Sequence, residues 1–140
     1  MYAKLDSSLL TGNEVIDGQH AELIGKINKL VESCESNGGQ KEAILMLDYL
    51  ADYTDFHFHA EEELQKQASY PGYELHKEKH EEFRHTVKEL HDMLLEDQGP
   101  TAAFVQAVNK NVIEWFYGHI KGFDCSVATY INMHSHPDLL

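Results

Sequence analysis

Three breaks that contain glycine or proline divide this chain into four long segments, and this division constrains the fold more than any other feature. Between the breaks the apolar residues recur with the helical period of about 3.6 residues, and not with the two-residue period of a strand. Short connections between long helices favour antiparallel neighbours. We therefore predict an all-α fold, an up-down-up-down antiparallel four-helix bundle. The breaks are Asn37-Gly38-Gly39, Ser69-Tyr70-Pro71-Gly72 and Gly99-Pro100.

The 140 residues are expected to form a single domain, because this length is sufficient to bury one core. Residues 1–14 are expected to form an irregular N-terminal arm, whose Leu5, Leu9 and Leu10 are available to cover one end of the core. The bundle is predicted over residues 15–133, with Pro100 in the first turn of its last helix. Residues 134–140 are predicted to form a tail, since Pro137 ends the last helix at or before its own position.

Composition excludes several classes of partner. The formal net charge of -13 would repel phosphate backbones and anionic lipid, so we expect neither nucleic acid nor a membrane as a partner. The sequence has no run of about 18 apolar residues and no signal-peptide core, which predicts a soluble cytoplasmic protein. Cys34 and Cys125 lie far apart and outside any Cys-x-x-Cys spacing, so we interpret both as free thiols.

Histidines lie inside the apolar stripes of the first two predicted helices. In the first segment, His20 falls within about 60° of the apolar residues on a helical wheel. In the second segment, His57 and Glu61 share the apolar face. The two glutamates that follow, Glu62 and Glu63, are expected to turn away from that face.

The third and fourth predicted helices also carry inward histidines. His76 and His80 share the apolar face of the third segment, and His119 lies near the middle of the inward stripe of the fourth. That last stripe is predicted to include Val105 and Tyr130. The other five histidines are assigned to the surface or the tail: His59, His85, His91, His134 and His136.

Asp124 does not fit the stripe of the last helix. It follows His119 by five residues, which places it about 140° from the inward face of a regular α-helix. A single π-type turn would bring the two side chains nearly into line, and such turns favour functional sites. We therefore predict a local π-type widening of the helix at this point if Asp124 is to serve as a ligand.

The inward set of histidines and carboxylates indicates a metal site. A single histidine on an apolar face is more often a hydrogen-bonded core residue than a ligand. Burying five imidazoles and a carboxylate without a metal, however, would leave too many polar atoms unsatisfied. Seven donors exceed the needs of one tetrahedral zinc ion, and a nitrogen-rich set with bridging carboxylates suits a pair of first-row ions. The predicted ligands are His20, His57, Glu61, His76, His80, His119 and Asp124.

The ligand types also indicate the chemistry. Di-iron oxidases use a glutamate from each of two helices and a Glu-x-x-His motif from each of the other two. This chain has only one such spacing, Glu82 to His85, and the helical wheel places that histidine outward. Fewer anionic ligands should stabilise high-valent iron less, which favours reversible dioxygen binding over oxygen activation.

With these residues in place, the sequence resembles the hemerythrin family, of the stand-alone bacterial type, over almost its whole length. The spacing of five from His119 to Asp124 is the family's own, which supports Asp124 as a ligand despite its place on a regular wheel. The matching stretches are Ile16 to His20 with Leu23, His57 to Glu62, His76 to His80, and Trp115 to Ile120 with Asp124.

The resemblance implies a di-iron centre with a bridging oxo or hydroxo group. In such a centre His76, His80 and His119 would hold one iron, His20 and His57 the other, and Glu61 and Asp124 would bridge them. Dioxygen would bind at the iron that has two histidines. By similarity to the family, the pocket for dioxygen would be lined by Leu23, Phe58, Trp115, Phe116 and Ile120, although aromatic stripes at this spacing are as often ordinary core.

The sequence therefore predicts a non-haem di-iron protein that binds dioxygen reversibly, for storage, delivery or sensing. The alternative is a di-iron enzyme, a peroxidase, an oxidase or a nitric-oxide-handling protein, that uses the same cluster. No protein partner is indicated. Cys125 directly follows a predicted bridging ligand, yet free cysteine in a bundle is more often inert filling than a redox group.

Overall fold

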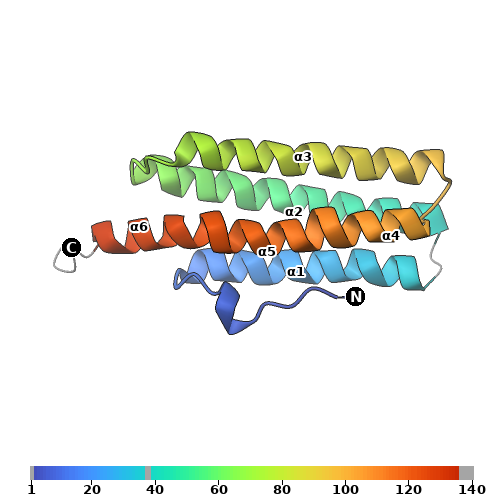
Figure 1. Cartoon of the computed structure of the whole chain (residues 1–140), viewed down its shortest axis with the longest axis horizontal. Coiled ribbons are helices and arrows are strands. Elements are labelled where there is room, and N and C mark those ends of the chain that lie inside the picture. Colours follow the sequence, from blue (N-terminus) through green and yellow to red (C-terminus); the bar gives the residue numbers. More distant parts are fainter. Residues whose placement is uncertain (1, 37–38, 136–140) are drawn as a thin grey trace.

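The computed structural model describes residues 2–36 and 39–135, and in this part of the chain it forms a four-helix bundle without strands (Figure 1). Four long rods lie side by side, and each is antiparallel to the next along the chain. The predicted all-α, up-down-up-down fold is confirmed. The first three rods are α1 (Glu14–Glu35), α2 (Gly39–Gln67) and α3 (Tyr73–Glu96).

The fourth rod is continuous but alternates between two helical forms. A π-helical turn closes i→i+5 hydrogen bonds and takes up one residue more than an α-helical turn. Each π-helical segment therefore shifts the helical wheel of the rod by one residue, or about 100°. In chain order the rod consists of α4 (Ala102–Val108), the π-helical segment η2 (Asn109–Glu114), α5 (Trp115–His119), the π-helical segment η3 (Ile120–Asp124) and α6 (Cys125–Ser135).

The shift in η2 explains why the prediction for Val105 is wrong. A regular wheel places Val105 on the same face as His119, but its side chain is 39% exposed. Because η2 lies between these two residues, Val105 is turned about 100° further from the His119 face. The neighbouring Phe104 lies on the inward side of the rod and is fully buried.

Side-chain caps fix where α1 and α4 begin. The side-chain oxygen of Asn13 accepts a hydrogen bond from the backbone N–H of Ile16 at 3.0 Å. The hydroxyl of Thr101 accepts one from the N–H of Phe104 at 3.1 Å. Pro100 therefore precedes the cap of α4, and the prediction that it lies in the first turn of this helix is wrong.

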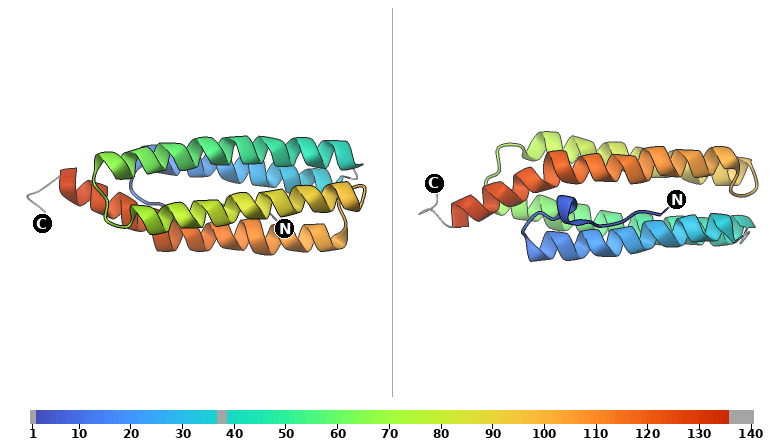
Figure 2. Two further views of the ribbon diagram at one scale, coloured as in Figure 1. Left: turned by 90° about the horizontal axis from the view of Figure 1, so that it is seen from above. Right: turned by 60° about the horizontal axis from the view of Figure 1, so that its bottom comes forward.

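The N-terminal arm lies along the bundle, between α1 and the fourth rod (Figure 2). The side chain of Asn28 in α1 accepts a hydrogen bond from the N–H of Ala3 at 2.7 Å and donates one to its carbonyl at 3.0 Å. The next N–H of the arm donates to the hydroxyl of Tyr117 in α5 at 2.8 Å. The arm has one 3-10 turn, Ser7–Leu9, in which Leu9 is buried. Leu10 is 52% exposed, so its predicted role in covering the core is wrong.

Apolar side chains fill the bundle on both sides of a polar centre. No helix in the described residues is both long enough and apolar enough to cross a membrane. The fourth rod is helical through Ser135, two positions beyond the predicted end of the bundle. The rest of the predicted tail, residues 136–140, lies outside the described residues, as do Asn37 and Gly38 of the first break. The fully buried core includes Ile16, Leu30, Leu47, Leu50, Leu94, Phe104, Val112 and Val127.

Candidate metal centre

Five histidines and two carboxylates from all four rods meet inside the bundle. α1 supplies one of them, α2 and α3 supply two each at i, i+4 spacing, and the fourth rod supplies two. None is more than 4% exposed. The structure thus brings together every residue that the sequence suggested as a ligand: His20, His57, Glu61, His76, His80, His119 and Asp124.

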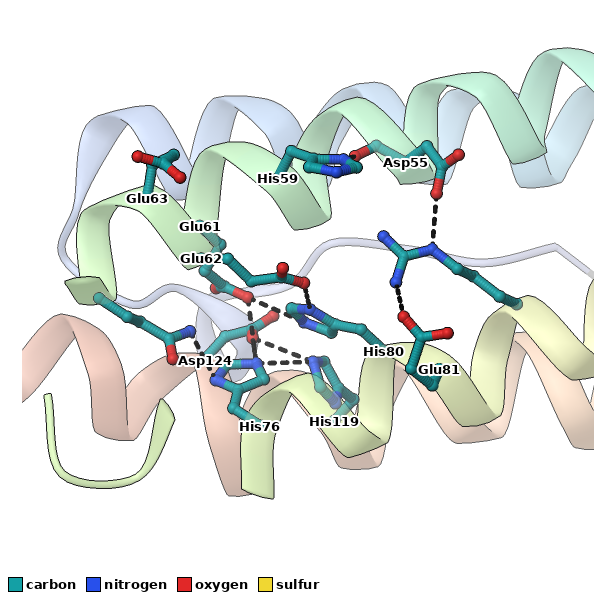
Figure 3. A network of polar contacts seen from close by, with 12 residues as sticks. Asp55, His59, Glu61, Glu62, Glu63, His76, His80, Glu81, His119 and Asp124 are labelled. Atoms are coloured by element: carbon teal, nitrogen blue, oxygen red, sulfur yellow. Dashed lines mark hydrogen bonds and ion pairs between the residues drawn. The ribbon is translucent and has the colours of Figure 1, made fainter. Parts of the chain in front are cut away.

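The donor atoms form two groups that share two carboxylates. His76, His80 and His119 each place a ring nitrogen within 4.8 Å of the others and of both carboxylates. His20 and His57 form a second group with the same two carboxylates, again within 4.8 Å. The shared residues are Glu61 and Asp124. Figure 3 shows the first group, with the three imidazoles turned toward Glu61 and Asp124.

Asp124 reaches the centre because the helix that carries it is locally wider. The segment η3 spans Ile120–Asp124, between His119 and the start of α6. It supplies the π-type turn that the spacing of five required. As a result, Oδ1 of Asp124 lies 3.2 Å from Nε2 of His119, and Oδ2 lies 2.7 Å from Nε2 of His20.

The donor atoms do not form a fully paired hydrogen-bonded network. Nε2 of His76 lies 3.0 Å from Oε1 of Glu61, 3.0 Å from Oδ1 of Asp124 and 3.0 Å from Nε2 of His119. A single ring N–H cannot serve three such neighbours. Nε2 of His20 lies close to Oδ2 of Asp124, yet neither atom has a hydrogen-bond partner in suitable geometry.

Many buried nitrogen and oxygen atoms of the cluster have no hydrogen-bond partner. Both oxygens of Glu61 and of Asp124 lack a hydrogen-bond partner, as do Nε2 of His57 and Nε2 of His80. An unsatisfied buried polar group costs about 1–3 kcal/mol, and a charged one costs more. A cation that accepts these lone pairs would remove the cost, so the residues fit a metal centre.

Three of the histidines are held by a polar side chain at the other ring nitrogen. Nδ1 of His57 lies 2.6 Å from Oε1 of Gln19, and Nδ1 of His80 lies 2.8 Å from Oε2 of Glu62. Such partners fix the tautomer and the orientation of a ligating imidazole. The prediction that Glu62 turns away from the interior is wrong, because α2 packs against α3 as well as α1 and Glu62 is buried on the α3 side.

The third partner is Gln65. Its amide Nε2 lies 2.9 Å from Nδ1 of His76, while its buried Oε1 has no partner. If Nε2 of His76 ligates a metal, Nδ1 must carry the proton. The amide of Gln65, rotated by about 180°, would then accept a hydrogen bond from this N–H through Oε1. In that orientation the Nδ1–H of His76 and Oε1 of Gln65 each have a hydrogen-bond partner. Gln65 was not singled out from the sequence, although it lies eight residues after His57, about 80° around the helix.

Burial and charge set the protonation of the metal-free centre. Burial lowers the pKa of His57 to about 4, so this ring is neutral near pH 7. Burial also acts to lower the pKa of His76, but the carboxylates of Asp124 and Glu61, each 3.0 Å from its Nε2, outweigh it and raise the pKa to about 9. Burial acts to raise the pKa of Asp124, and the facing imidazoles, His119 foremost, hold it well below its usual value.

A small apolar cavity of about 10 Å³ adjoins the centre. Aromatic walls of this cavity rest on the ligand rings: Phe58 stacks on His80 at 3.8 Å, and Phe116 meets His20 edge-on at 5.4 Å. Of the five predicted pocket residues, Ile120 is buried but is not part of this lining. The cavity is lined by Leu23, Phe58, Trp115 and Phe116, together with Ile27, Leu50, Thr54 and Phe83.

The remaining histidines lie apart from the centre. His59 and His85 are exposed, His59 near the backbone of Asp55 and His85 in an ion pair with Glu89. His91 is half-buried and lines a groove between α2 and α3. The side chains of His134 and His136 lie outside the described part of the chain.

Both cysteines are free and half-buried, as the sequence predicted. Burial raises the pKa of Cys34 and of Cys125, and for Cys125 the neighbouring carboxylate of Asp124 raises it further. A raised pKa lowers the thiolate fraction near neutral pH.

Comparison with known proteins identifies relatives over most of the chain. Residues 11–124 match the hemerythrin HHE cation binding domain. A bacteriohemerythrin of Stenotrophomonas maltophilia (strain R551-3) is 32% identical over 124 residues, which cover 88% of this chain and 77% of that protein. A bacteriohemerythrin of Aquifex aeolicus (strain VF5) is 29% identical over 117 residues, which cover 84% of this chain and 88% of that protein.

The fold comparison agrees with the sequence comparison. A crystal structure of wild-type hemerythrin superimposes with a TM-score of 0.79 at 21% identity, over 94% of this chain and 98% of that chain, which shows the shared fold. The family match and the buried cluster of His, Glu and Asp together support iron binding at this site. Because the matched region, residues 11–124, contains all seven clustered side chains, the chain belongs to the hemerythrin family.

Proposed function

We propose that this protein holds two iron ions and binds dioxygen reversibly, for storage, delivery or sensing. The observation that carries the proposal is the division of the donor atoms into two groups that share Glu61 and Asp124. One group would hold an iron through three histidines, and the other would hold a second iron through two. The two carboxylates would bridge the irons, together with an oxo or hydroxo group.

The unequal number of histidines indicates where a ligand would bind. An iron held by His20 and His57 would have one protein donor fewer than its neighbour, which would leave a coordination position for an exogenous ligand. The apolar cavity adjoins both groups, since its wall residue Phe116 meets His20 edge-on and its wall residue Phe58 stacks on His80. When bound, two irons would supply the place where dioxygen is held and the two electrons that it takes up and returns.

The side chains around the cavity would keep the site dry. Phe58 and Phe116 cover ligand rings, and the seven donor residues are at most 4% exposed. Exclusion of water removes a source of protons, and proton supply would promote the irreversible loss of reduced oxygen. The partners at Nδ1 would keep the histidine rings in place while the charge at the centre changes.

The test is an optical spectrum of the iron-quantified, anaerobically reduced protein before oxygen is added, after it is added and after it is purged. The proposal expects visible charge-transfer bands that appear with oxygen and vanish on purging, with both irons again reduced. Bands that decay into a stable oxidised spectrum would instead indicate a di-iron enzyme or a redox sensor. Iron content is measured on the same sample, because a dinuclear carrier stops at two irons per chain.

A further inference from the structure

Two hollows of different size share one wall next to the centre. The cavity beside the ligands has a volume of only about 10 Å³, whereas a groove of about 460 Å³ opens to solvent between α2 and α3. Thr54 from α2 and Phe83 from α3 line both. The groove and the cavity are thus adjacent at these two side chains, which we call the wall.

From this arrangement we propose that a small uncharged diatomic molecule reaches the centre through the α2–α3 groove and passes between Thr54 and Phe83. The inference rests on the proposed function, because it assigns an access path to the same site. The hollow at Tyr49 and Phe56 and the hollow at Tyr70 and Tyr130 share no lining residue with the cavity.

The wall suits the passage of an apolar molecule. The hydroxyl of Thr54 donates a hydrogen bond to the carbonyl of Leu50 at 2.6 Å, so its donor is satisfied within α2. The ring of Phe83 meets Phe58 and Trp115 at centroid distances of 5.9 and 4.8 Å, and all three are apolar surfaces. Passage of a diatomic molecule requires only small side-chain displacements, which are fast motions.

The mouth of the groove is built differently from the wall. Nε of Arg84 donates to Oδ1 of Asp55 at 2.7 Å, and this ion pair joins α3 to α2 in the lining of the groove. The guanidinium also lies 5.3 Å from the ring centroid of Phe58. A charged or hydrated molecule would have to leave its water at the apolar floor, which is unfavourable, whereas an uncharged diatomic gas would not.

The sequence supplies an internal reporter for this passage. Trp115 is the one tryptophan of the chain; it lines the cavity and is half-buried, so the change in its quenching between variants, and not the absolute value, reports on the passage. Dioxygen quenches tryptophan fluorescence on collision, so the bimolecular quenching constant of the metal-free protein, corrected for fluorescence lifetime, measures how fast dioxygen reaches this ring. Acrylamide, which is larger and polar, serves as the second quencher.

Substitutions on the path should change that constant in opposite directions. Phe83→Leu and Thr54→Ala thin the wall and should raise the oxygen quenching constant by about threefold, because each lowers the barrier to passage. Ala51→Leu fills the floor of the groove and should lower the constant by about twofold. The matched control is Phe56→Leu, the same change at a 56% exposed position of α2, which should leave the constant unchanged.

The iron-loaded protein provides a second readout. A residue that only controls passage changes the association and dissociation rates of dioxygen by the same factor and leaves the affinity unchanged, whereas a residue that contacts bound ligand changes the affinity. We expect Ala51→Leu, which lines the groove and not the cavity, to lower both rates about twofold in stopped-flow measurements.

The outcomes separate the two proposals. Unchanged quenching constants in both Thr54→Ala and Ala51→Leu would overturn the passage, and these two variants suffice if Phe83→Leu does not fold. A change in affinity without a matching change in both rates would overturn it as well. If the iron-loaded protein fails to bind oxygen reversibly, the proposed function falls, while quenching of Trp115 in the metal-free protein still decides whether this passage exists.

Discussion

Nδ1 of His80 donates a hydrogen bond to Oε2 of Glu62 across the packing surface between α3 and α2, at 2.8 Å. Glu62 is buried, and of the three side chains found at Nδ1 atoms of the clustered histidines it is the charged one; Gln19 and Gln65 are neutral amides. A carboxylate in this position increases the electron donation of the imidazole to a bound metal. The two metal positions are therefore expected to differ in electron density as well as in ligand number.

Replacing Glu62 with glutamine should weaken metal binding without unfolding the protein. The amide retains the size and the acceptor oxygen but removes the charge, and loss of such a partner costs about tenfold or more in metal affinity. Affinity is measured by competition with a chelator, and the reduction potential of the loaded protein should rise. Glu63→Gln, at the next position but exposed, is the matched control. Equal affinities and potentials for the two variants would contradict a role for Glu62 through His80.

Removing a predicted ligand should lower the iron content. His119→Ala deletes one donor of the three-histidine group and leaves the other donors of that group buried. We expect fewer than two irons per chain after reconstitution, measured by metal analysis against protein concentration. His59→Ala removes an exposed imidazole elsewhere on the bundle and should retain full iron content. Full occupancy in the His119 variant would show that this histidine is not a ligand.

The metal-free protein should lose stability in acid through His57. Its pKa is about 4 in the folded state, against 6.5 for an unperturbed histidine, so the unfolded state binds the proton more tightly. The free energy of unfolding should therefore fall as the pH decreases from 6.5 to about 4, by about 3 kcal/mol from this group.

His76 acts in a different pH window. Its pKa is raised to about 9, so its contribution to the free energy of unfolding is complete below pH 6.5 and is lost as the pH rises through 9.

Urea unfolding of the metal-free wild type and of His57→Gln, between pH 4 and 6.5, isolates the contribution of His57. The two curves should converge in acid, and parallel curves would rule out His57 as the source.

The fourth rod should depend on its cap. Thr101→Ala removes the hydroxyl that accepts from the N–H of Phe104, which should cost about 1 kcal/mol and lower Tm by about 3 °C. Thr101→Ser keeps the acceptor and should remain close to wild type. Thermal unfolding followed by circular dichroism distinguishes the two variants, and identical values of Tm would exclude the cap as a stabilising contact.

Helical periodicity was sufficient to predict the fold and the inward positions of His20, His57 and His76, because α1, α2 and α3 are regular helices. Helical periodicity failed for Val105 because a helical wheel assumes a constant 100° per residue and does not include a π-helical turn. For Asp124 the spacing could state only that such a turn was required.

Other features depend on how the helices lie relative to each other. Glu62 is buried because α2 packs against two neighbours, and a wheel drawn for one helix gives a single inward direction. The wall formed by Thr54 and Phe83 joins two helices, and its existence depends on a distance between them that no local pattern encodes.

The two π-helical segments also affect how relatives of this chain should be compared. A π-helical turn is structurally equivalent to one inserted residue that the rest of the helix does not have to accommodate. Relatives whose last helix differs in length by one residue should therefore place the gap within 109–114 or 120–124 and keep every buried face on either side. A gap placed elsewhere in the alignment would pair inward residues with outward ones and obscure the common ancestry of this helix.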